Sequence, residues 1–509
     1  MTYNLKSLLL IIRGSVLANF IFSFIIVLFV YHLVTLQISP LPWFDETFFA
    51  SITSTYSASG TYALRIAPFA YNNELLLYGP LYFWITSWLT NVFEFSIFSF
   101  RLSGVLFGFL DLFILYKIIR LYIERNFCYI IILAIALDPL LNSSMNSGRM
   151  ECVALFFVLL AIYVYLKAII DATGSSRKFL LIIVSGLTFS AALLTTPRVG
   201  IILLALCLTQ LFYLFKRFSY QILLQLMVFG VVLTSIYYLW ILYAFGSIEN
   251  LLSYYAEFKE YIGSSWFHIP VQQIPLAVIT LISIFLGAYL DHKRFFTRLV
   301  FISFLAILLF YISVHDTGTY STLIIPFQYV IIGSSFYLAY KESPLKKRPL
   351  FKIAVLAPIF LILSFNSLFF SLKALTIYIT YETRNPKYID DFVKSNIPPG
   401  SKVIGDDLYF YAVHHSKSDF QFISHFKSNL EREYYHRKIY DYDYILWSEQ
   451  LANDAPQILK TYQNNSKLIK IAEFKFNQNK NFPFINTIQF LSKIPIERSY
   501  NCILFKRLN

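Results

Sequence analysis

The chain has 509 residues, of which 57% are hydrophobic, 19% aromatic and only 14% charged, and its formal net charge is +13. A soluble chain carries about 25% charged residues because its surface must face water. Together with the mean hydropathy of +0.60, this excludes an ordinary soluble protein and favours a membrane protein. The basic residues form short clusters between apolar runs, so no nucleic-acid partner is expected.

Eleven apolar runs are predicted to be membrane-spanning helices, because a span needs about 20 apolar residues. They lie near residues 14–36, 98–118, 127–143, 150–168, 179–196, 199–215, 222–245, 272–290, 299–314, 322–340 and 353–374. No small-residue cleavage site follows the first run, so it is predicted to be a retained span rather than a signal peptide. An odd number of spans places the two termini on opposite sides of the membrane.

The basic residues between these spans alternate from one side to the other. One side carries clusters at Lys6/Arg13, Lys117/Arg120/Arg125, Lys167/Arg177/Lys178, Lys216/Arg217, Lys293/Arg294/Arg298 and Lys341/Lys346/Lys347/Arg348/Lys352. The other side carries only scattered residues such as Arg65, Arg149 and Arg198. The positive-inside rule therefore predicts a cytoplasmic N-terminus and an outward-facing C-terminus. The expected location is the bacterial inner membrane.

The first outer loop, residues 37–97, is predicted to be partly helical and held at the membrane surface. Its segment 80–95, PLYFWITSWLTNVFEF, is short for a span and rich in aromatic residues, which favours a helix in the interface. The stretch TFFASITSTY after Glu46 is predicted to be a second such helix. Long loops with structure of their own are usually functional.

The composition changes near residue 380, after which no run is able to span a bilayer. KYIDDFVKSN predicts a short helix, and SKVIGD, YDYILW and YNCILFKR predict strands. The predicted fold class is thus a polytopic α-helical membrane protein with about eleven spans and interfacial helices. Residues 1–379 form its transmembrane catalytic domain, and residues 380–509 form an extracytoplasmic α/β domain.

The acidic pair Asp45–Glu46, in ISPLPWFDETFF just outside the first span, is the strongest candidate site. Local sequence leaves two interpretations open. An acidic pair at a helix start can cap it and interact with its dipole. Alternatively, an Asp can accept a proton from an attacking hydroxyl as a general base.

Arginines at outer span ends form a second set of candidates. Arg149 lies with Glu151 in DPLLNSSMNSGRMEC, Arg198 lies in LLTTPRVG, and Arg65 lies in the first outer loop. Because the positive-inside rule disfavours these positions, each arginine needs an acidic side chain or a phosphate as partner. We expect at least one of them to bind phosphate.

Tyrosines beside these segments are the remaining candidates for substrate binding. Tyr78 and Tyr82 flank Gly79-Pro80, and Tyr320 follows His315–Asp316 in SVHDTGTYSTLIIP. Two adjacent ligands without a third make poor metal geometry. No metal or other cofactor is therefore predicted to be required.

These motifs, in this order, resemble the GT-C glycosyltransferases that use polyprenyl-phosphate sugars, especially bacterial aminoarabinose transferases of lipid A and protein O-mannosyltransferases. The resemblance covers most of residues 10–375. It rests on PWFDE, YGPLYFWITSWL, FSFRLSGVLFGFLDLFILYKIIR, ALDPLLNSSMNSGRME and a Tyr-then-Pro span start at 320–326.

The resemblance implies inverting transfer of a sugar from a polyprenyl (undecaprenyl) phosphate carrier to a lipid, glycan or protein acceptor. Asp45 corresponds to the family's catalytic carboxylate, with Glu46 beside it. Some relatives contact the carrier phosphate through a lysine where this chain has Gly79, which leaves that contact to Arg149 or Arg198. Relatives often have Arg-x-Asp where this chain has Arg149-Met150-Glu151. The family often ends in an outer α/β domain.

Three alternatives are considered, the first of which belongs to another functional class. A transporter or flippase for lipid-linked glycans would place polar residues in mid-membrane and often shows inverted repeats, neither of which is evident. A phosphoethanolamine-type transferase would want a metal-binding outer domain, yet the tail histidines lack ligand spacing. A polymerase or ligase with a lipid-diphosphate donor shares the same carrier and membrane side, so the sequence leaves it open.

Overall fold

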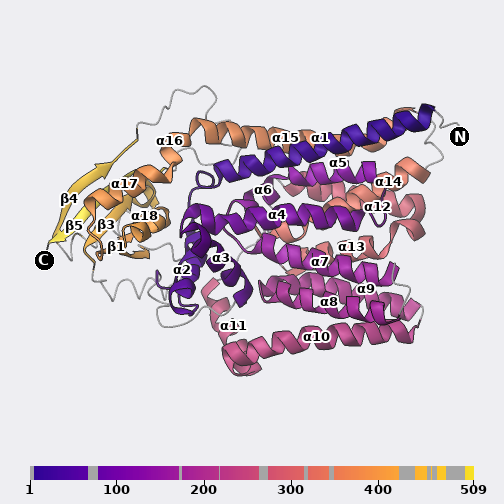
Figure 1. Ribbon diagram of the computed structural model, residues 1–509, viewed down its shortest axis with the longest axis horizontal. Coiled ribbons are helices and arrows are strands. Elements are labelled where there is room, and N and C mark those ends of the chain that lie inside the picture. Colours follow the sequence, from indigo (N-terminus) through magenta and orange to yellow (C-terminus); the bar gives the residue numbers. More distant parts are fainter. Residues whose placement is uncertain are drawn as a thin grey trace.

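The computed structural model describes residues 5–66, 78–170, 175–216, 218–262, 273–313, 319–342, 349–422, 442–454, 460, 463, 467–476 and 499–508. Most of them form a helical bundle, and a small sheet-containing domain packs at one end of it (Figure 1). The bundle helices are α1 (Leu5–Thr35), α4 (Ile97–Ile119), α5 (Arg125–Ala136), α6 (Pro139–Met145), α7 (Glu151–Ile170), α8 (Ser175–Leu193), α9 (Gly200–Lys216), α10 (Tyr220–Phe245), α12 (Ile274–Phe295), α13 (Arg298–Ser313), α14 (Ile325–Glu342) and α15 (Pro349–Ile379).

A helix lies at each of the eleven predicted span positions. Among the described residues, eight helices are long and apolar enough to cross a membrane, and the bent pair α5–α6 raises that number to nine. Helix α13, with 16 residues, is apolar but shorter than a full span. The polytopic helical fold is therefore confirmed, whereas the count of eleven spans stays a prediction.

The bend of 64° between α5 and α6 has a local cause. Pro139 begins α6, and the Asp138 carboxylate accepts hydrogen bonds from the backbone of Leu140 and Leu141 at 3.0 and 3.1 Å. This is a helix N-cap followed by proline in the first position, so a new helix starts here with a new direction.

Outward-facing apolar side chains cover the peripheral helices of the bundle. Leu239 and Tyr243 on α10, and Phe285 and Tyr289 on α12, are all at least 64% exposed. Water would not stabilise such surfaces, whereas lipid solvates them. The interior is packed by one continuous apolar cluster that extends across α4, α5, α7, α9 and α14.

The first outer loop forms helices α2 (Phe44–Ser59) and α3 (Pro80–Phe93), as predicted. Gly60 ends α2 in the left-handed conformation with φ 72°, which glycine adopts without steric cost. Pro80 occupies the first turn of α3. Trp84, Trp88 and Val92 are exposed at four-residue intervals on α3, a stripe suited to the membrane interface.

After α15 the chain forms α16 (Tyr381–Arg384), α17 (Pro386–Asn396), α18 (Phe410–His415) and a five-stranded sheet. The strands are β1 (Lys402–Gly405), β2 (Asp419–Phe422), β3 (Tyr444–Ser448), β4 (Lys467–Phe474) and β5 (Cys502–Leu508), in the order β2-β1-β3-β5-β4. Strands β2, β1 and β3 are parallel, and β5 and β4 join them in antiparallel pairing. The predicted helix and three strands are present, whereas β2, β4 and α18 were not predicted.

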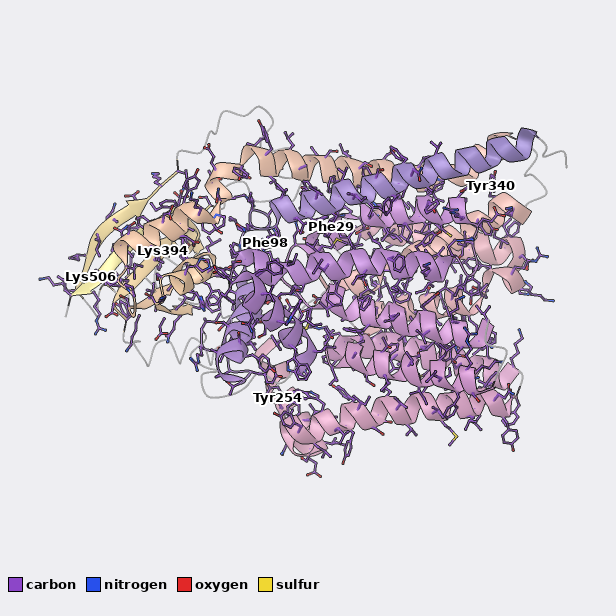
Figure 2. The ribbon with its side chains drawn as sticks, in the orientation of Figure 1. Phe29, Phe98, Tyr254, Tyr340, Lys394 and Lys506 are labelled. Carbon is purple, nitrogen blue, oxygen red and sulfur yellow. The ribbon has the colours of Figure 1, made fainter. Side chains whose placement is uncertain are left out.

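This domain and the start of α1 lie at opposite ends of the bundle (Figure 1). Figure 2 shows Lys394 and Lys506 of the domain at one end of the molecule and Tyr340 of the bundle at the opposite end. A second apolar core joins the domain to α2 and α3, with Phe49, Phe83 and Tyr411 among its members. The domain is thus packed directly on the first outer loop.

Candidate functional site

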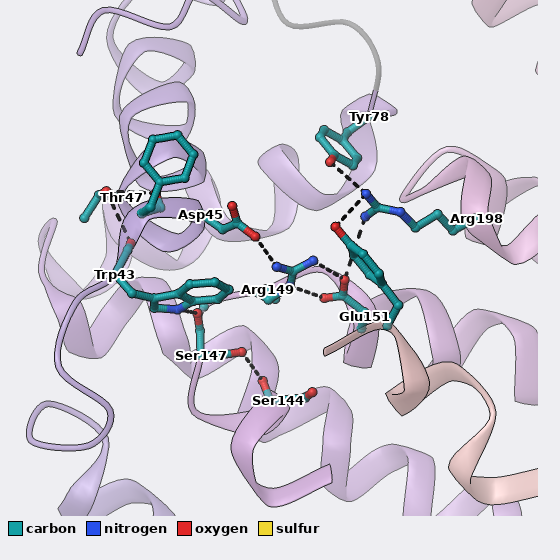
Figure 3. Close-up of polar contacts among 12 residues, drawn as sticks. Trp43, Asp45, Thr47, Tyr78, Ser144, Ser147, Arg149, Glu151 and Arg198 are labelled. Atoms are coloured by element: carbon teal, nitrogen blue, oxygen red, sulfur yellow. Dashed lines mark hydrogen bonds and ion pairs between the residues drawn. The ribbon is translucent and has the colours of Figure 1, made fainter. Parts of the chain in front are cut away.

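Four charged side chains from three segments form one charged cluster: Asp45, Arg149, Glu151 and Arg198. Arg149 Nη1 donates to Asp45 Oδ2, and Arg149 Nε and Nη2 donate to the two Glu151 oxygens at 3.0 and 2.7 Å. Arg198 Nη1 lies 4.0 Å from Glu151 Oε1. Figure 3 shows the Arg149–Glu151 pair between Asp45 on one side and Arg198 on the other.

The centre and the two ends of this charged cluster differ in burial. The side chains of Arg149 and Glu151 are 2% and 1% exposed, whereas those of Asp45 and Arg198 are 33% and 25% exposed. Burial alone would lower the pKa of Arg149, but the carboxylates of Glu151 and Asp45 outweigh it and raise that pKa. Arg149 therefore stays charged. Within the charged cluster, only the side chains of Asp45 and Arg198 are partly exposed.

Aromatic rings pack against both guanidinium groups of the charged cluster. The Tyr320 ring centre lies 3.8 Å from Arg198 Cζ and 4.9 Å from Arg149 Cζ, a cation–π arrangement. Arg198 Nη2 donates to the hydroxyls of Tyr320 and Tyr78 at 2.9 and 3.3 Å. Trp43 lies 5.4 Å from Arg149 Cζ. These contacts hold the arginines in fixed orientations.

One donor of Arg198 is left without a hydrogen bond. Its Nη1 is buried and makes no hydrogen bond to any described residue, although Glu151 lies within ion-pair distance. Buried donors normally have acceptors, so such an atom calls for an explanation. An anionic oxygen beside Arg198 would supply the missing acceptor.

Glu46 lies in different surroundings from its neighbour Asp45. Its side chain is 0% exposed, and Arg101 Nε and Nη2 donate to its two oxygens at 2.7 and 2.6 Å. Arg101 Nη1 also donates to the carbonyls of Leu36 and Pro40, each at 2.7 Å. This buried pair, Glu46–Arg101, ties α2 and the preceding loop to α4.

Arg101 was not among the predicted site residues, although the sequence contains a signal for it. It is a single arginine near the outer end of a predicted span, within FSFRLSG. The same argument that selected Arg149 and Arg198, an arginine against the charge rule that needs an anionic partner, applies to it. Its partner is Glu46.

Two predicted substrate-binding residues lie outside the charged cluster. Tyr82 is fully buried and its hydroxyl donates to the Gly148 carbonyl at 2.7 Å, so it supports the loop before Arg149. Arg65 is exposed, and none of its contacts with the described residues joins it to the charged cluster. Proximity along the sequence did not reveal that these two side chains point elsewhere.

Steric contact explains why residue 79 is a glycine. A Cβ atom there would lie 2.0 Å from the Leu194 carbonyl oxygen, far inside contact distance. The backbone of Leu81 also donates to that same oxygen at 3.1 Å. The start of α3 is therefore pressed against the end of α8, and a lysine does not fit at residue 79.

Within the described ranges, no group of three His, Cys, Asp or Glu side chains is arranged to hold a metal ion. His315 and Asp316 lie outside those ranges.

The whole chain superposes on a known structure, ArnT from Cupriavidus metallidurans in the apo state. The TM-score is 0.63 at 14% sequence identity, covering 97% of this chain and 98% of ArnT. The structure of ArnT bound to undecaprenyl phosphate gives a TM-score of 0.60 at 13% identity, covering 96% and 97% of the two chains. This chain has the GT-C glycosyltransferase fold.

Residues 78–243 of this GT-C chain also match the family described as dolichyl-phosphate-mannose-protein mannosyltransferase. No curated protein sequence matches the chain. The family match together with the fold confirms the predicted resemblance and the predicted enzyme class, a multi-pass membrane glycosyltransferase.

Proposed function

We propose that this GT-C protein transfers a sugar from polyprenyl phosphate, of the undecaprenyl type, to a lipid, glycan or protein acceptor. The reaction takes place at the outer face of the bacterial inner membrane. The charged cluster supports this because its Asp45 adjoins Glu46, which accepts a hydrogen bond from Tyr411 of the C-terminal domain. An apolar carrier stays in the bilayer while its phosphate and sugar emerge at such a surface. ArnT, which has the same fold, binds undecaprenyl phosphate.

The exposure of Asp45 is the observation that carries the proposal. The charged cluster and the buried pair contain three carboxylates. Two of them, Glu46 and Glu151, are buried and make bidentate contacts with an arginine. Asp45 is held by Arg149 through Oδ2 only, and its Oδ1 makes no hydrogen bond to any described residue. Asp45 therefore offers an oriented and accessible acceptor for a proton.

The proposed step is a single displacement. The acceptor hydroxyl oxygen attacks the anomeric carbon while its proton passes to Asp45 Oδ1. The bond from that carbon to the phosphate oxygen breaks, and its electron pair leaves with the polyprenyl phosphate. Attack opposite the leaving group inverts the anomeric carbon.

Arg198 is the proposed partner of the leaving phosphate. Its side chain is partly exposed, its guanidinium is fixed by Tyr320 and Tyr78, and Nη1 makes no hydrogen bond to the described residues. A preorganised cation stabilises charge where it develops, and its effect is larger in a site shielded from water. The proposal assigns this charge to arginine and requires no metal ion. Arg149 orients Asp45, and Glu46 has a positioning role.

A cavity lined by Gln273, whose side chain contacts the residue next to Tyr320, supports the binding of an apolar carrier chain. It has a volume of about 180 Å³ and lies between the α5–α6 bend and helices α12, α14 and α15. Its lining is mostly apolar, with Leu276, Ile279, Leu361 and Phe365 among its residues. Gln273, at its rim, donates to Ser321, the neighbour of Tyr320.

Replacement of Asp45 by asparagine tests the proposal. Purified protein in detergent, given a radiolabelled polyprenyl-phosphate sugar and a membrane extract, should transfer label to the acceptor fraction. Asp45→Asn should abolish transfer with an unchanged thermal unfolding midpoint, while Asp291→Asn, at the far end of α12, should remain active. A fully active Asp45→Asn protein would contradict the proposal.

A further inference from the structure

A hydroxyl from the C-terminal domain reaches the acidic pair. The Tyr411 hydroxyl, on α18, donates to Glu46 Oε1 at 3.3 Å across 365 residues of sequence. Glu46 is the next residue after Asp45 on α2. We propose that Tyr411 is a positioning residue for glycosyl transfer. Through Glu46 it holds the first turn of α2, and with it Asp45, in the orientation that receives the proton. This inference rests on the function proposed above.

The first turn of α2 depends on such contacts because its N-terminus lacks a side-chain cap. Trp43 occupies the cap position and makes no side-chain hydrogen bond to the helix. Acidic side chains in a first turn commonly satisfy helix N–H groups. Here they point away from the helix backbone, since Glu46 contacts Arg101 and Tyr411 and Asp45 contacts Arg149. Tertiary contacts therefore replace the local cap in setting this turn.

Tyr411 itself is held rigidly. Its side chain is buried, and its ring stacks on Phe95, in the turn between α3 and α4, with centroids 5.7 Å apart and an interplanar angle of 28°. Burial, followed by the nearby Glu46 carboxylate, raises the pKa of Tyr411 well above its ordinary value. The hydroxyl therefore remains protonated and able to donate to Glu46.

A second hydrogen bond connects α18 to α2, so the two helices are joined at two points. His414 Nε2 lies 3.0 Å from Ser54 Oγ, about two helical turns beyond Glu46. His415, next on α18, bonds through Nε2 to the Phe95 carbonyl at 2.9 Å. Helix α2 is thus fixed by Arg101 from the bundle and by α18 from the C-terminal domain. Of the two α18 contacts with α2, the Tyr411 contact is the one nearer to Asp45, and loss of the Tyr411 hydroxyl removes it.

The test compares two tyrosines that differ in their partners. Tyr411→Phe removes the hydroxyl that contacts Glu46, whereas Tyr409→Phe removes a buried hydroxyl that donates to the Asn501 carbonyl within the same domain at 3.0 Å. With radiolabelled polyprenyl-phosphate sugar, Tyr411→Phe should lower kcat about tenfold, the size expected for one hydrogen bond to a charged group. KM for the donor should be unchanged, and Tyr409→Phe should keep the wild-type kcat. Equal kcat values for the two variants would overturn the proposal.

Hydrogen exchange supplies a readout that does not need activity. In Tyr411→Phe the backbone amides of residues 47–50 should exchange faster than in the wild-type chain and in Tyr409→Phe. Unchanged exchange of these amides in Tyr411→Phe would contradict the positioning role of Tyr411 but not the proposed function. A wild-type chain that transfers no sugar would contradict the proposed function, while faster exchange in Tyr411→Phe would still support the contact as the restraint on α2.

Discussion

Two neighbouring carboxylates on α2 have opposite surroundings. Asp45 is one-third exposed and joins the charged cluster, whereas Glu46 is fully buried in its pair with Arg101. A buried ion pair must be matched closely, because taking charges out of water is costly. An accessible carboxylate remains free to act on a substrate. In the proposed function, the acidic pair Asp45–Glu46 combines a carboxylate that receives a proton, Asp45, with the residue that holds it in place, Glu46.

Breaking the buried pair should have the largest effect on stability. Arg101→Leu leaves Glu46 buried without its cation, so the free energy of unfolding should fall by about 3–5 kcal/mol. Arg294→Leu removes a cation from an exposed ion pair with Asp291, at 3.5 Å, and should cost at most about 0.5 kcal/mol. Thermal and denaturant unfolding in detergent measure both values. Similar losses of unfolding free energy for the two variants would show that the buried pair Glu46–Arg101 stabilises the fold no more than an exposed ion pair does.

Replacement of the partly exposed Arg198 should affect activity rather than stability. Arg198→Gln takes away the proposed partner of the leaving phosphate, so kcat should fall by about 10²- to 10³-fold. Arg65→Gln removes an exposed arginine that, within the described residues, makes no ion pair with the charged cluster, and it should leave kcat unchanged. Single-turnover transfer measures both variants. An Arg198→Gln chain as active as Arg65→Gln would remove Arg198 from the mechanism.

A smaller, pH-dependent effect should come from the contact between α18 and the first outer loop. Burial alone would lower the pKa of His415, but the Asp390 carboxylate at 2.8 Å and the Phe95 carbonyl outweigh it and raise that pKa. The neighbouring His414, in contrast, has a pKa lowered to about 4, mainly by burial. Of these two histidines, only His415 is therefore expected to titrate near neutral pH.

Because the pKa of His415 is raised on folding, its stabilising effect is complete below about pH 6.5, the unfolded value. It is lost as the pH rises through the folded value. The thermal midpoint of the wild-type chain should therefore fall over this range, and His415→Gln should lack that part of the decline. Parallel pH profiles for the two proteins would contradict this assignment.

Apolar runs predicted the helices of the bundle, because the bilayer imposes a strong constraint on span length, whereas the orientation given by the charge rule stays a prediction. The same charge rule selected Arg149 and Arg198, and it would have selected Arg101. It did not reveal that Tyr82 supports a loop or that Arg65 lies apart from the charged cluster, since side-chain direction depends on packing. Tyr411 had no sequence signal, because its partner is 365 residues away. Strand β4, with exposed residues on both faces, also lacked a clear alternating pattern.

In the proposed reaction Asp45, rather than Glu46, receives the proton from the acceptor. Single-turnover sugar transfer by Asp45→Asn, compared with the wild-type chain at equal donor occupancy, tests it most directly. The transfer rate should fall by about 10²- to 10⁴-fold, the usual size for a general base, with an unchanged unfolding midpoint. A rate close to that of the wild-type chain, with the fold intact, would contradict it.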